Sequence, residues 1–454
     1  MKGSSGWMLV VTLLVIASMA ASDIGCSYVD REVSLGNTAT GYVPNVWTQT
    51  SLTDFQAGGL SRTDVTSAPG SVVLGAAFKD PGVYALAGGT SRSFYRYNIT
   101  ANTWAAMASI PVYVYSGSSM ACDGIRYVYA LVGSSSTALY RYDVVLNTWS
   151  LFNNTPSAIG NGGDLAWDGT YIYVLCGSSV RTIWTLDPAT GLWDDLTLTP
   201  QTVSTGASMI VSNGALYVAR GGGYTTVWRY TIGTGAWATI SVSRGAITAG
   251  SDMVIGPNGR PYCSYNVNSN WRLESYNPAT TSWTTHARVT GQSLGNGGGM
   301  ACDGATTIFA APGGGARSFY AYSPSSNTWT SRNDVPAAVT TGGCLVYVPA
   351  VRTGYQLSGS FTSSTFDTNV AGAKYIQAFW DRSIPASTAL TLEVRSSASL
   401  SGGAPSGTWQ LLGSGSSGTM SALTGRYVQW RATFTTSDPA VTPQLQEVRI
   451  YYRA

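Results

Sequence analysis

The sequence has few charged side chains: Asp, Glu, Lys and Arg together make up 10% of its 454 residues, against about 25% in an ordinary soluble protein. The formal net charge of +3 is spread thinly, without a cluster of Lys and Arg. Nucleic-acid-binding surfaces carry such clusters, so we expect no nucleic-acid partner. The low charge does not indicate disorder, because 44% of the residues are hydrophobic.

Histidine is almost absent, which narrows the catalytic chemistry open to the chain. His286 is the single histidine, so it alone could be the base of a Ser-His-Asp triad, and no Gly-x-Ser-x-Gly turn accompanies it. The six cysteines are scattered without a Cys-x-x-Cys pair, so the spacings of zinc and haem sites are missing. Phosphate-loop and dinucleotide signatures are missing too. We therefore expect no cofactor and no metal, and we favour a non-enzymatic protein.

The longest apolar run, residues 7–21, is shorter than the roughly 20 residues that cross a bilayer. With Lys2 before it and small residues at its end, it favours a cleaved secretory signal. A retained helix of a pilus-like filament, cut after Gly3, is one alternative. A lipoprotein with Cys26 as acceptor is another, which Asp23 disfavours. We expect a secreted or cell-surface protein that contacts a membrane only if this segment is retained.

What the sequence does contain is an internal repeat of about 45 residues. Tryptophan recurs at nearly even intervals, at Trp104, Trp149, Trp193, Trp237, Trp283 and Trp329. Seven residues before each Trp stands a large side chain, at Tyr97, Tyr142, Leu186, Tyr230, Tyr276 and Tyr322. Because this spacing never varies, the turn between the two positions has one fixed length.

Each repeat predicts four short antiparallel strands. An Asp-Gly or Asn-Gly hairpin turn follows the first strand, at Asp123, Asp168, Asn213, Asn258 and Asp303. An alternating apolar strand ending in glycine comes next, then the strand with Tyr and the strand that opens at Trp. Four strands in about 45 residues are the size of one propeller blade. A blade cannot bury both faces of its sheet alone, so we expect the Trp and Tyr at contacts between blades.

The glycines after the second strand, the aromatic residue in the third and the Trp that opens the fourth resemble the kelch repeat over about residues 70–335. The family's glycine doublet begins at Gly88, Gly221 and Gly313, whereas the fifth repeat has Cys263 and its neighbours instead. The resemblance implies an all-β fold with a six-bladed kelch-like β-propeller, or a seven-bladed one with an incomplete blade. We expect closing strands from both ends of the chain.

Those closing strands are predicted around Trp47 and in residues 343–348. Beyond the repeats, about 100 residues alternate apolar and polar positions, as in residues 390–395 and 428–434, which predicts strands half buried against a second layer. This module resembles a β-sandwich of the jelly-roll type. The expected domains are an N-terminal segment over 1–21, the propeller over 22–350 and the sandwich over 351–454.

Propeller ligands are expected on the face formed by the connections between blades and between second and third strands. The ligand-binding candidates there are Arg92, Asn161, Asp164, Arg181, Arg244, Asp252, Trp271, Asn296 and Arg317. Arginine and tryptophan beside asparagine and aspartate could hold a glycan through stacking and bidentate hydrogen bonds. Alternatively, the glycines and serines of these connections only let strands crowd near the axis. We assign no catalytic residue.

The sequence thus favours an exported surface protein that acts by adhesion, glycan binding or self-assembly. Its expected partners are glycans, other surface proteins or further copies of itself. Two alternatives stay open: a carbohydrate-active enzyme that uses Asp164, Asp252 or Arg244, and a subunit of a pilus-like filament. Asn98 and Asn153 begin Asn-x-Thr sequons and are candidates for glycosylation.

Overall fold

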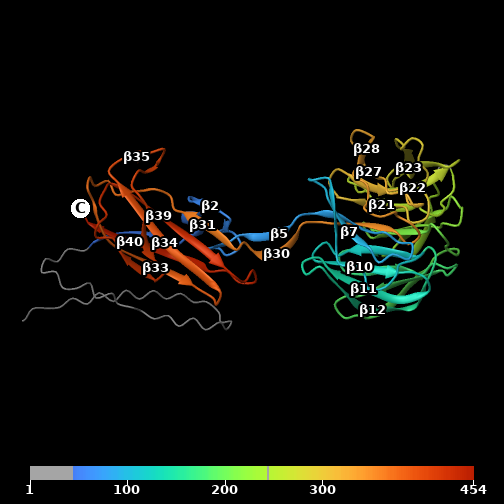
Figure 1. Cartoon of the computed structure of the whole chain (residues 1–454), viewed down its shortest axis with the longest axis horizontal. Coiled ribbons are helices and arrows are strands. Elements are labelled where there is room, and N and C mark those ends of the chain that lie inside the picture. Colours follow the sequence, from blue (N-terminus) through green and yellow to red (C-terminus); the bar gives the residue numbers. More distant parts are fainter. Residues whose placement is uncertain (1–43, 243–244, 454) are drawn as a thin grey trace, which may run out of the picture. The chain divides into compact units, whose positions relative to one another are not determined.

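The computed structural model describes residues 44–242 and 245–453 (Figure 1). Nearly all of their regular structure is β-strand, and the single helix in these residues is the short α1 (Leu52–Gln56). None of the described helical structure is long and apolar enough to cross a bilayer. The predicted all-β fold is confirmed, whereas the predicted N-terminal segment 1–21 lies outside the described residues.

Six four-stranded antiparallel sheets, which we call blades 1 to 6, follow one another along the chain. Blade 1 contains β29 (Cys344–Val348), β6 (Gly82–Leu86), β7 (Phe94–Asn98) and β8 (Thr103–Ala106). Blade 2 contains β9 (Ser118–Cys122), β10 (Tyr127–Val132), β11 (Ser136–Asp143) and β12 (Thr148–Ile159). Blade 3 contains β13 (Asp164–Trp167), β14 (Ile172–Leu175), β15 (Thr182–Leu186) and β16 (Trp193–Leu198).

Blades 4 to 6 have the same strand order. Blade 4 contains β17 (Ser208–Ser212), β18 (Ala215–Ala219), β19 (Val227–Thr231) and β20 (Ala236–Thr239). Blade 5 contains β21 (Asp252–Ile255), β22 (Pro261–Val267), β23 (Asn270–Asn277) and β24 (Ser282–Thr285). Blade 6 contains β25 (Gly299–Cys302), β26 (Ile308–Ala311), β27 (Phe319–Ser323) and β28 (Thr328–Arg332).

The first strands of the blades contact one another in a closed cycle, in the order β29, β9, β13, β17, β21, β25 and back to β29. A separate buried hydrophobic cluster fills each contact between neighbouring blades, including that between blades 6 and 1. Successive residues of a second strand face opposite neighbours: Val83 packs toward blade 6 and Tyr84 toward blade 2. Both faces of each blade are therefore buried, and the ring closes into a propeller.

Strand β29 closes the ring from the far end of the chain. It pairs with β6, placing Cys344 opposite Leu86 and Val348 opposite Gly82. Blade 1 thus takes its first strand from after blade 6 and its other three strands from before blade 2. The closing strand predicted in residues 343–348 is confirmed.

The N-terminal closing strand predicted around Trp47 is wrong. That residue lies in β1 (Asn45–Gln49), which pairs with β40 (Gln444–Arg453), and its ring stacks on Phe366 with 4.8 Å between ring centroids. Each Trp on the fourth strand of a blade has a large residue seven positions upstream, whereas Trp47 has Thr40 there. The predicted start of the propeller at residue 22 also differs from the structure, because residues 45–74 pair with strands of the C-terminal region.

The C-terminal strands and residues 45–74 form two six-stranded sheets around one buried core, which we call the two-sheet unit. Its first sheet contains β1, β3 (Thr63–Asp64), β4 (Val72–Leu74), β40, β33 (Lys374–Ser383) and β38 (Ser417–Thr419). Its second sheet contains β2 (Gly59–Ser61), β31 (Ser358–Thr362), β32 (Phe366–Asp367), β34 (Thr388–Ser397), β37 (Gln410–Gly413) and β39 (Tyr427–Thr436). Two pairs lie outside these sheets, namely β5 (Ala76–Lys79) with β30 (Val351–Tyr355), and β35 (Leu400–Ser401) with β36 (Ala404–Pro405).

The alternation predicted for the C-terminal strands is present in this core. Leu392 on β34 and Trp430 on β39 are fully buried, whereas the adjacent Glu393 and Arg431 lie on the other face of the same sheet and form an ion pair. Because side chains alternate along a strand, this register sends every second residue into the core.

The repeated Tyr and Trp lie opposite each other on the third and fourth strands of their blades. In blade 2 the rings of Tyr142 and Trp149 have centroids 5.1 Å apart. The indole N–H of Trp149 donates to the carbonyl of Ala108, which precedes blade 2, and the N–H of Ala108 donates to Asn147 Oδ1. Asn147 Oδ1 also accepts from the hydroxyl of Tyr142. The predicted packing of these aromatic residues at blade contacts is confirmed.

Replacing Trp149 with phenylalanine is expected to lower the free energy of unfolding by about 1–2 kcal/mol more than the same change at Trp193. The indole nitrogen of Trp149 lies 2.9 Å from the carbonyl oxygen of Ala108, whereas the buried indole nitrogen of Trp193 has no hydrogen-bond partner. Urea unfolding of both variants at one pH measures the difference. Equal losses would show that the indole hydrogen bonds do not hold neighbouring blades together.

Candidate functional site

A cavity of about 400 Å³ lies among the first strands of all six blades. The strand registers align one residue per blade around the cavity, and these residues are Ser119, Asp164, Ser208, Asp252, Gly299 and Cys344. All of them except Ser208 line the cavity. Four successive blades thus alternate a hydroxyl with a carboxylate. We call this set the axial ring.

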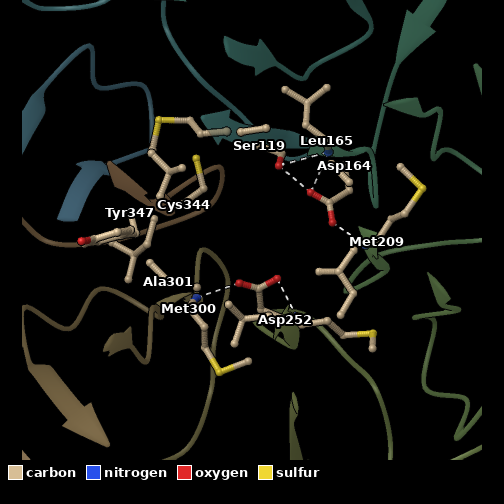
Figure 2. Close-up of a pocket in the computed structure, with 18 of the residues that line it drawn as sticks. Ser119, Asp164, Leu165, Met209, Asp252, Met300, Ala301, Cys344 and Tyr347 are labelled. Atoms are coloured by element: carbon tan, nitrogen blue, oxygen red, sulfur yellow. Dashed lines mark hydrogen bonds between the residues drawn. The ribbon is translucent and has the colours of Figure 1, made fainter. Parts of the chain in front are cut away.

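Asp164 ties three blades together through its carboxylate (Figure 2). Its Oδ1 accepts a hydrogen bond from the hydroxyl of Ser119 in blade 2, at 2.5 Å, and one from the N–H of Leu165 at 2.8 Å. Its Oδ2 accepts from the N–H of Met209 in blade 4. Burial raises the pKa of Asp164.

Asp252 repeats this arrangement two blades further on. Its Oδ1 accepts from the hydroxyl of Ser208 in blade 4, at 2.9 Å, and from the N–H of Met253 at 2.8 Å. Its Oδ2 accepts from the N–H of Met300 in blade 6 at 2.7 Å, and Figure 2 shows both carboxylates on the wall of the same cavity. Burial, and then the negative charge of Asp164, raise the pKa of Asp252 to about 7.

These hydrogen bonds make each carboxylate a link between neighbouring blades. An ionised carboxylate has about four acceptor positions, so Asp164 and Asp252 each keep about one acceptor position for any further group. Neither carboxylate belongs to an ion pair found among the described residues. Within residues 44–242 and 245–453, no group of three or more His, Cys, Asp or Glu side chains could hold a metal ion.

The single histidine packs between strands of blades 5 and 6. His286 Nε2 lies 2.8 Å from the hydroxyl oxygen of Ser275, and its ring stacks on Tyr262 with 5.1 Å between centroids. Burial lowers the pKa of His286. Ser275 is only 2% exposed, so a substrate could not reach its hydroxyl.

Six connections between blades surround one end of the cavity, and each contains a glycine with positive φ. These glycines are Gly117, Gly162, Gly206, Gly250, Gly297 and Gly342. A Cβ at any of them would collide with a backbone carbonyl in the next connection of the ring, so only glycine lets the connections pack edge to edge. The residues before the glycines are small or polar and uncharged, namely Ser116, Asn161, Thr205, Ala249, Asn296 and Thr341.

The connections between blades, and those from second to third strands, lie on one face of the propeller, because successive strands are antiparallel. We call it the loop face, and we call the opposite face, which carries the hairpin turns, the turn face. The predicted residues Asn161 and Asn296 are exposed at the mouth of the cavity on the loop face. Arg92, Arg181 and Arg317 are exposed on the same face, in connections from second to third strands. Asp164 and Asp252 lie deeper, in the axial ring.

Two of the predicted ligand-binding residues do not join this set. Trp271 is 1% exposed and packs on Trp329 with 4.9 Å between ring centroids, so its predicted role on the surface is wrong. Trp271 belongs to the third strand β23, where apolar side chains fill the contact between blades 5 and 6. Arg244 lies outside the described residues.

The two predicted glycosylation sites differ in their surroundings. Asn98 is partly exposed at the end of β7, and its Oδ1 accepts from the N–H of Ala101. Asn153 donates its amide to the carbonyl of Gly191, and the sequon hydroxyl of Thr155 is buried. The glycosylation of both residues stays a prediction.

The sequence did not predict the hydroxyl partners of Asp164 and Asp252, nor two exposed tyrosines of the loop face. Ser119 precedes Asp164 by 45 residues and Ser208 precedes Asp252 by 44 residues, which is one repeat in each case, so the spacing contained the signal. Tyr113 and Tyr224 lie in connections whose lengths differ from blade to blade, and the repeat therefore gave no signal for them.

Three solved structures resemble this chain at low similarity. YjhT is 14% identical, with 57% of this chain and 93% of that chain covered and a TM-score of 0.44. A chain of the nidogen/laminin complex is 13% identical, with 59% and 98% covered and a TM-score of 0.46. TolB from Acinetobacter baumannii is 12% identical, with 61% and 68% covered and a TM-score of 0.46.

No family model and no curated protein matches the chain. The evidence for the propeller is therefore its own strand pairing and the closed cycle of its first strands.

Proposed function

We propose that this chain is an exported recognition protein that binds glycans through the loop face of its propeller. The observation that supports this most is the contrast between the polar groups of the axial ring and those of the loop face. The carboxylates of the axial ring each accept three hydrogen bonds from neighbouring protein groups. The loop face instead exposes uncharged polar side chains, arginines and tyrosines, which are the groups that bind sugar hydroxyls and sugar rings.

The type of the repeats, the type of the two-sheet unit and export to the cell surface belong to the same proposal. The Tyr, Asn and Trp set at blade contacts and the glycines after the second strands support repeats of the kelch type. The shared core of the two-sheet unit supports a β-sandwich of the jelly-roll type. The low charge of the whole chain and the apolar residues 7–21 support export to the cell surface.

Two tyrosines of the loop face are placed to stack on sugar rings. Tyr113, in the connection from blade 1 to blade 2, is 55% exposed, and Tyr224, in blade 4, is 49% exposed. The guanidinium of Arg220 lies over the ring of Tyr224, 3.5 Å from its centroid. Tyr171 offers a matched control, because it is 42% exposed but lies in a hairpin turn on the turn face.

A glycan array followed by calorimetric titration of the best ligand tests the proposal. We expect the double variant Tyr113→Ala/Tyr224→Ala to bind about 5- to 150-fold more weakly than the wild type, because stacking contributes roughly 0.5–1.5 kcal/mol per ring. Tyr171→Ala should keep the wild-type affinity. Absence of binding to every glycan, or equal losses in both variants, would contradict glycan recognition by the loop face.

A carbohydrate-active enzyme is the second candidate, and the pKa of Asp252 favours it. A carboxyl group with a pKa of about 7 can donate a proton in neutral solution, as a general acid must. Release of reducing ends from a panel of polysaccharides, compared between the wild type and the double variant Asp164→Asn/Asp252→Asn, decides between the two candidates. Turnover that disappears in the variant while the fold persists would replace recognition with catalysis.

A further inference from the structure

Four arginines of the loop face share one arrangement. Arg92, Arg181, Arg220 and Arg317 all lie in connections from second to third strands. Each donates its Nε hydrogen to a backbone carbonyl in a connection between blades, at 2.9, 2.5, 3.2 and 2.8 Å respectively. The bond fixes the guanidinium, and the terminal nitrogens stay available for a planar, bidentate contact with an acidic group.

The four arginines form two pairs on opposite sides of the ring. Arg317 and Arg92 belong to the neighbouring blades 6 and 1, and Arg181 and Arg220 belong to the neighbouring blades 3 and 4. The second pair flanks a single connection, since Arg181 binds the carbonyl of Thr199 and Arg220 that of Thr202. In blades 2 and 5, which lie between the pairs, the connections from second to third strands are short and contain no charged residue.

The two faces of the propeller differ in charge. Among the described residues, the connections of the loop face contain one carboxylate, Asp334, and these arginines: Arg92, Arg181, Arg220, Arg288 and Arg317. The hairpin turns of the opposite face contain Asp123, Asp168, Asp187 and Asp303, against Arg126 and Arg260. The positive potential is therefore concentrated on the face with the cavity mouth.

We propose that the ligand of the loop face is an anionic polysaccharide, whose carboxylate or sulfate groups bind the Arg92–Arg317 pair and the Arg181–Arg220 pair on either side of the mouth. This inference rests on the proposed function and adds the charge of the ligand. A polymer fits better than a single sugar, because the pairs lie on opposite sides of the ring. A glycan fits better than an acidic protein segment, because the surface between the pairs is a rim of uncharged polar side chains such as Asn161 and Asn296.

The test uses the full chain and four probes: polygalacturonate, dextran sulfate, uncharged dextran and poly-L-glutamate. Three variants carry Arg92→Gln/Arg317→Gln, Arg181→Gln/Arg220→Gln, or all four changes. Arg260→Gln/Arg453→Gln is the control, because it removes two positive charges outside the loop face. Arg92→Lys/Arg317→Lys separates charge from the Nε hydrogen bond, and melting temperatures report whether each variant folds.

Each glutamine pair is expected to weaken binding of polygalacturonate or dextran sulfate about tenfold at 0.15 M salt, and the quadruple variant at least about hundredfold. The dependence of affinity on salt should shrink with each pair removed. The control pair should bind as the wild type does. The lysine pair should bind more tightly than the glutamine pair but more weakly than the wild type, because lysine keeps the charge and cannot make the bidentate contact.

Equal binding of uncharged dextran and the charged polysaccharides would overturn this inference and leave glycan recognition standing. Binding of poly-L-glutamate as tight as that of polygalacturonate would overturn it in favour of an acidic protein partner. Affinity unchanged in the quadruple variant would remove the arginines from the site. Binding to none of the glycans would contradict the proposed function itself.

Discussion

Replacing Gly342 with alanine is expected to prevent the propeller from closing, whereas the same change at Gly304 is expected to cost only about 1 kcal/mol. Both glycines have positive φ, +85° and +72° respectively, so alanine is strained at either position. A Cβ at Gly304 would meet nothing within 4 Å, but a Cβ at Gly342 would collide with the carbonyl group of Tyr115. The connection that holds Gly342 precedes the closing strand β29, so a shift there separates blades 1 and 6.

Urea unfolding of the two alanine variants measures this effect. We expect Gly342→Ala to lose at least about 3 kcal/mol more than Gly304→Ala, or to give no soluble folded protein. The backbone conformation is matched in the two variants, so the difference reports the crowding of the connections alone. Similar stabilities would show that the connections around the mouth can move apart without cost, and the account of ring closure would fail.

The free energy of unfolding is expected to fall by up to about 4 kcal/mol through Asp252 as the pH rises from about 4 to about 7. The folded-state pKa of about 7 is above the ordinary value of 3.8, because the carboxyl is buried and lies near the negative charge of Asp164. The stabilising contribution of the neutral carboxyl is therefore complete below pH 4 and is lost as the pH rises through 7. Asp164, whose pKa is also raised, acts in the same direction.

The difference between the wild type and Asp252→Asn isolates this contribution from that of other groups. Asparagine stays neutral, so its stability relative to the wild type should increase steadily from pH 4 to pH 7 and then level off. Asp187→Asn is the control: hydrogen bonds lower the pKa of Asp187, so its titration adds no slope above about pH 5. A constant difference between wild type and Asp252→Asn over this range would show that Asp252 is already ionised at pH 4.

The propeller could be predicted from the sequence because its packing repeats. Each Trp on a fourth strand pairs with a large residue seven positions earlier on the third strand, and this pairing needs a fixed turn length. The strand in residues 343–348 could be predicted too, because the blade count leaves one first strand unfilled. Trp47 misled the prediction, because a lone indole in an extended segment fits any half-buried sheet, and its partner Phe366 is distant in the sequence.

The candidate site was only partly predictable, because its residues depend on how the blades are arranged around the axis. Asp164 and Asp252 were predicted as ligand-binding residues of the loop face, yet their hydrogen bonds run to neighbouring blades. Reading the aligned first strands as a set would have shown Ser119 and Ser208 at equivalent positions. The pairing of Arg181 with Arg220 could not be predicted, because it depends on the one connection that both side chains contact.

The claim that the loop face is the working surface, and that the axial carboxylates are structural, is tested most directly by one comparison of glycan-array profiles. The wild type, Asp164→Asn/Asp252→Asn and Tyr113→Ala/Tyr224→Ala are measured side by side at pH 7. We predict that the axial variant reproduces the wild-type profile and that the tyrosine variant loses it. The reverse result, with binding lost only when the axial carboxylates are changed, would contradict the account.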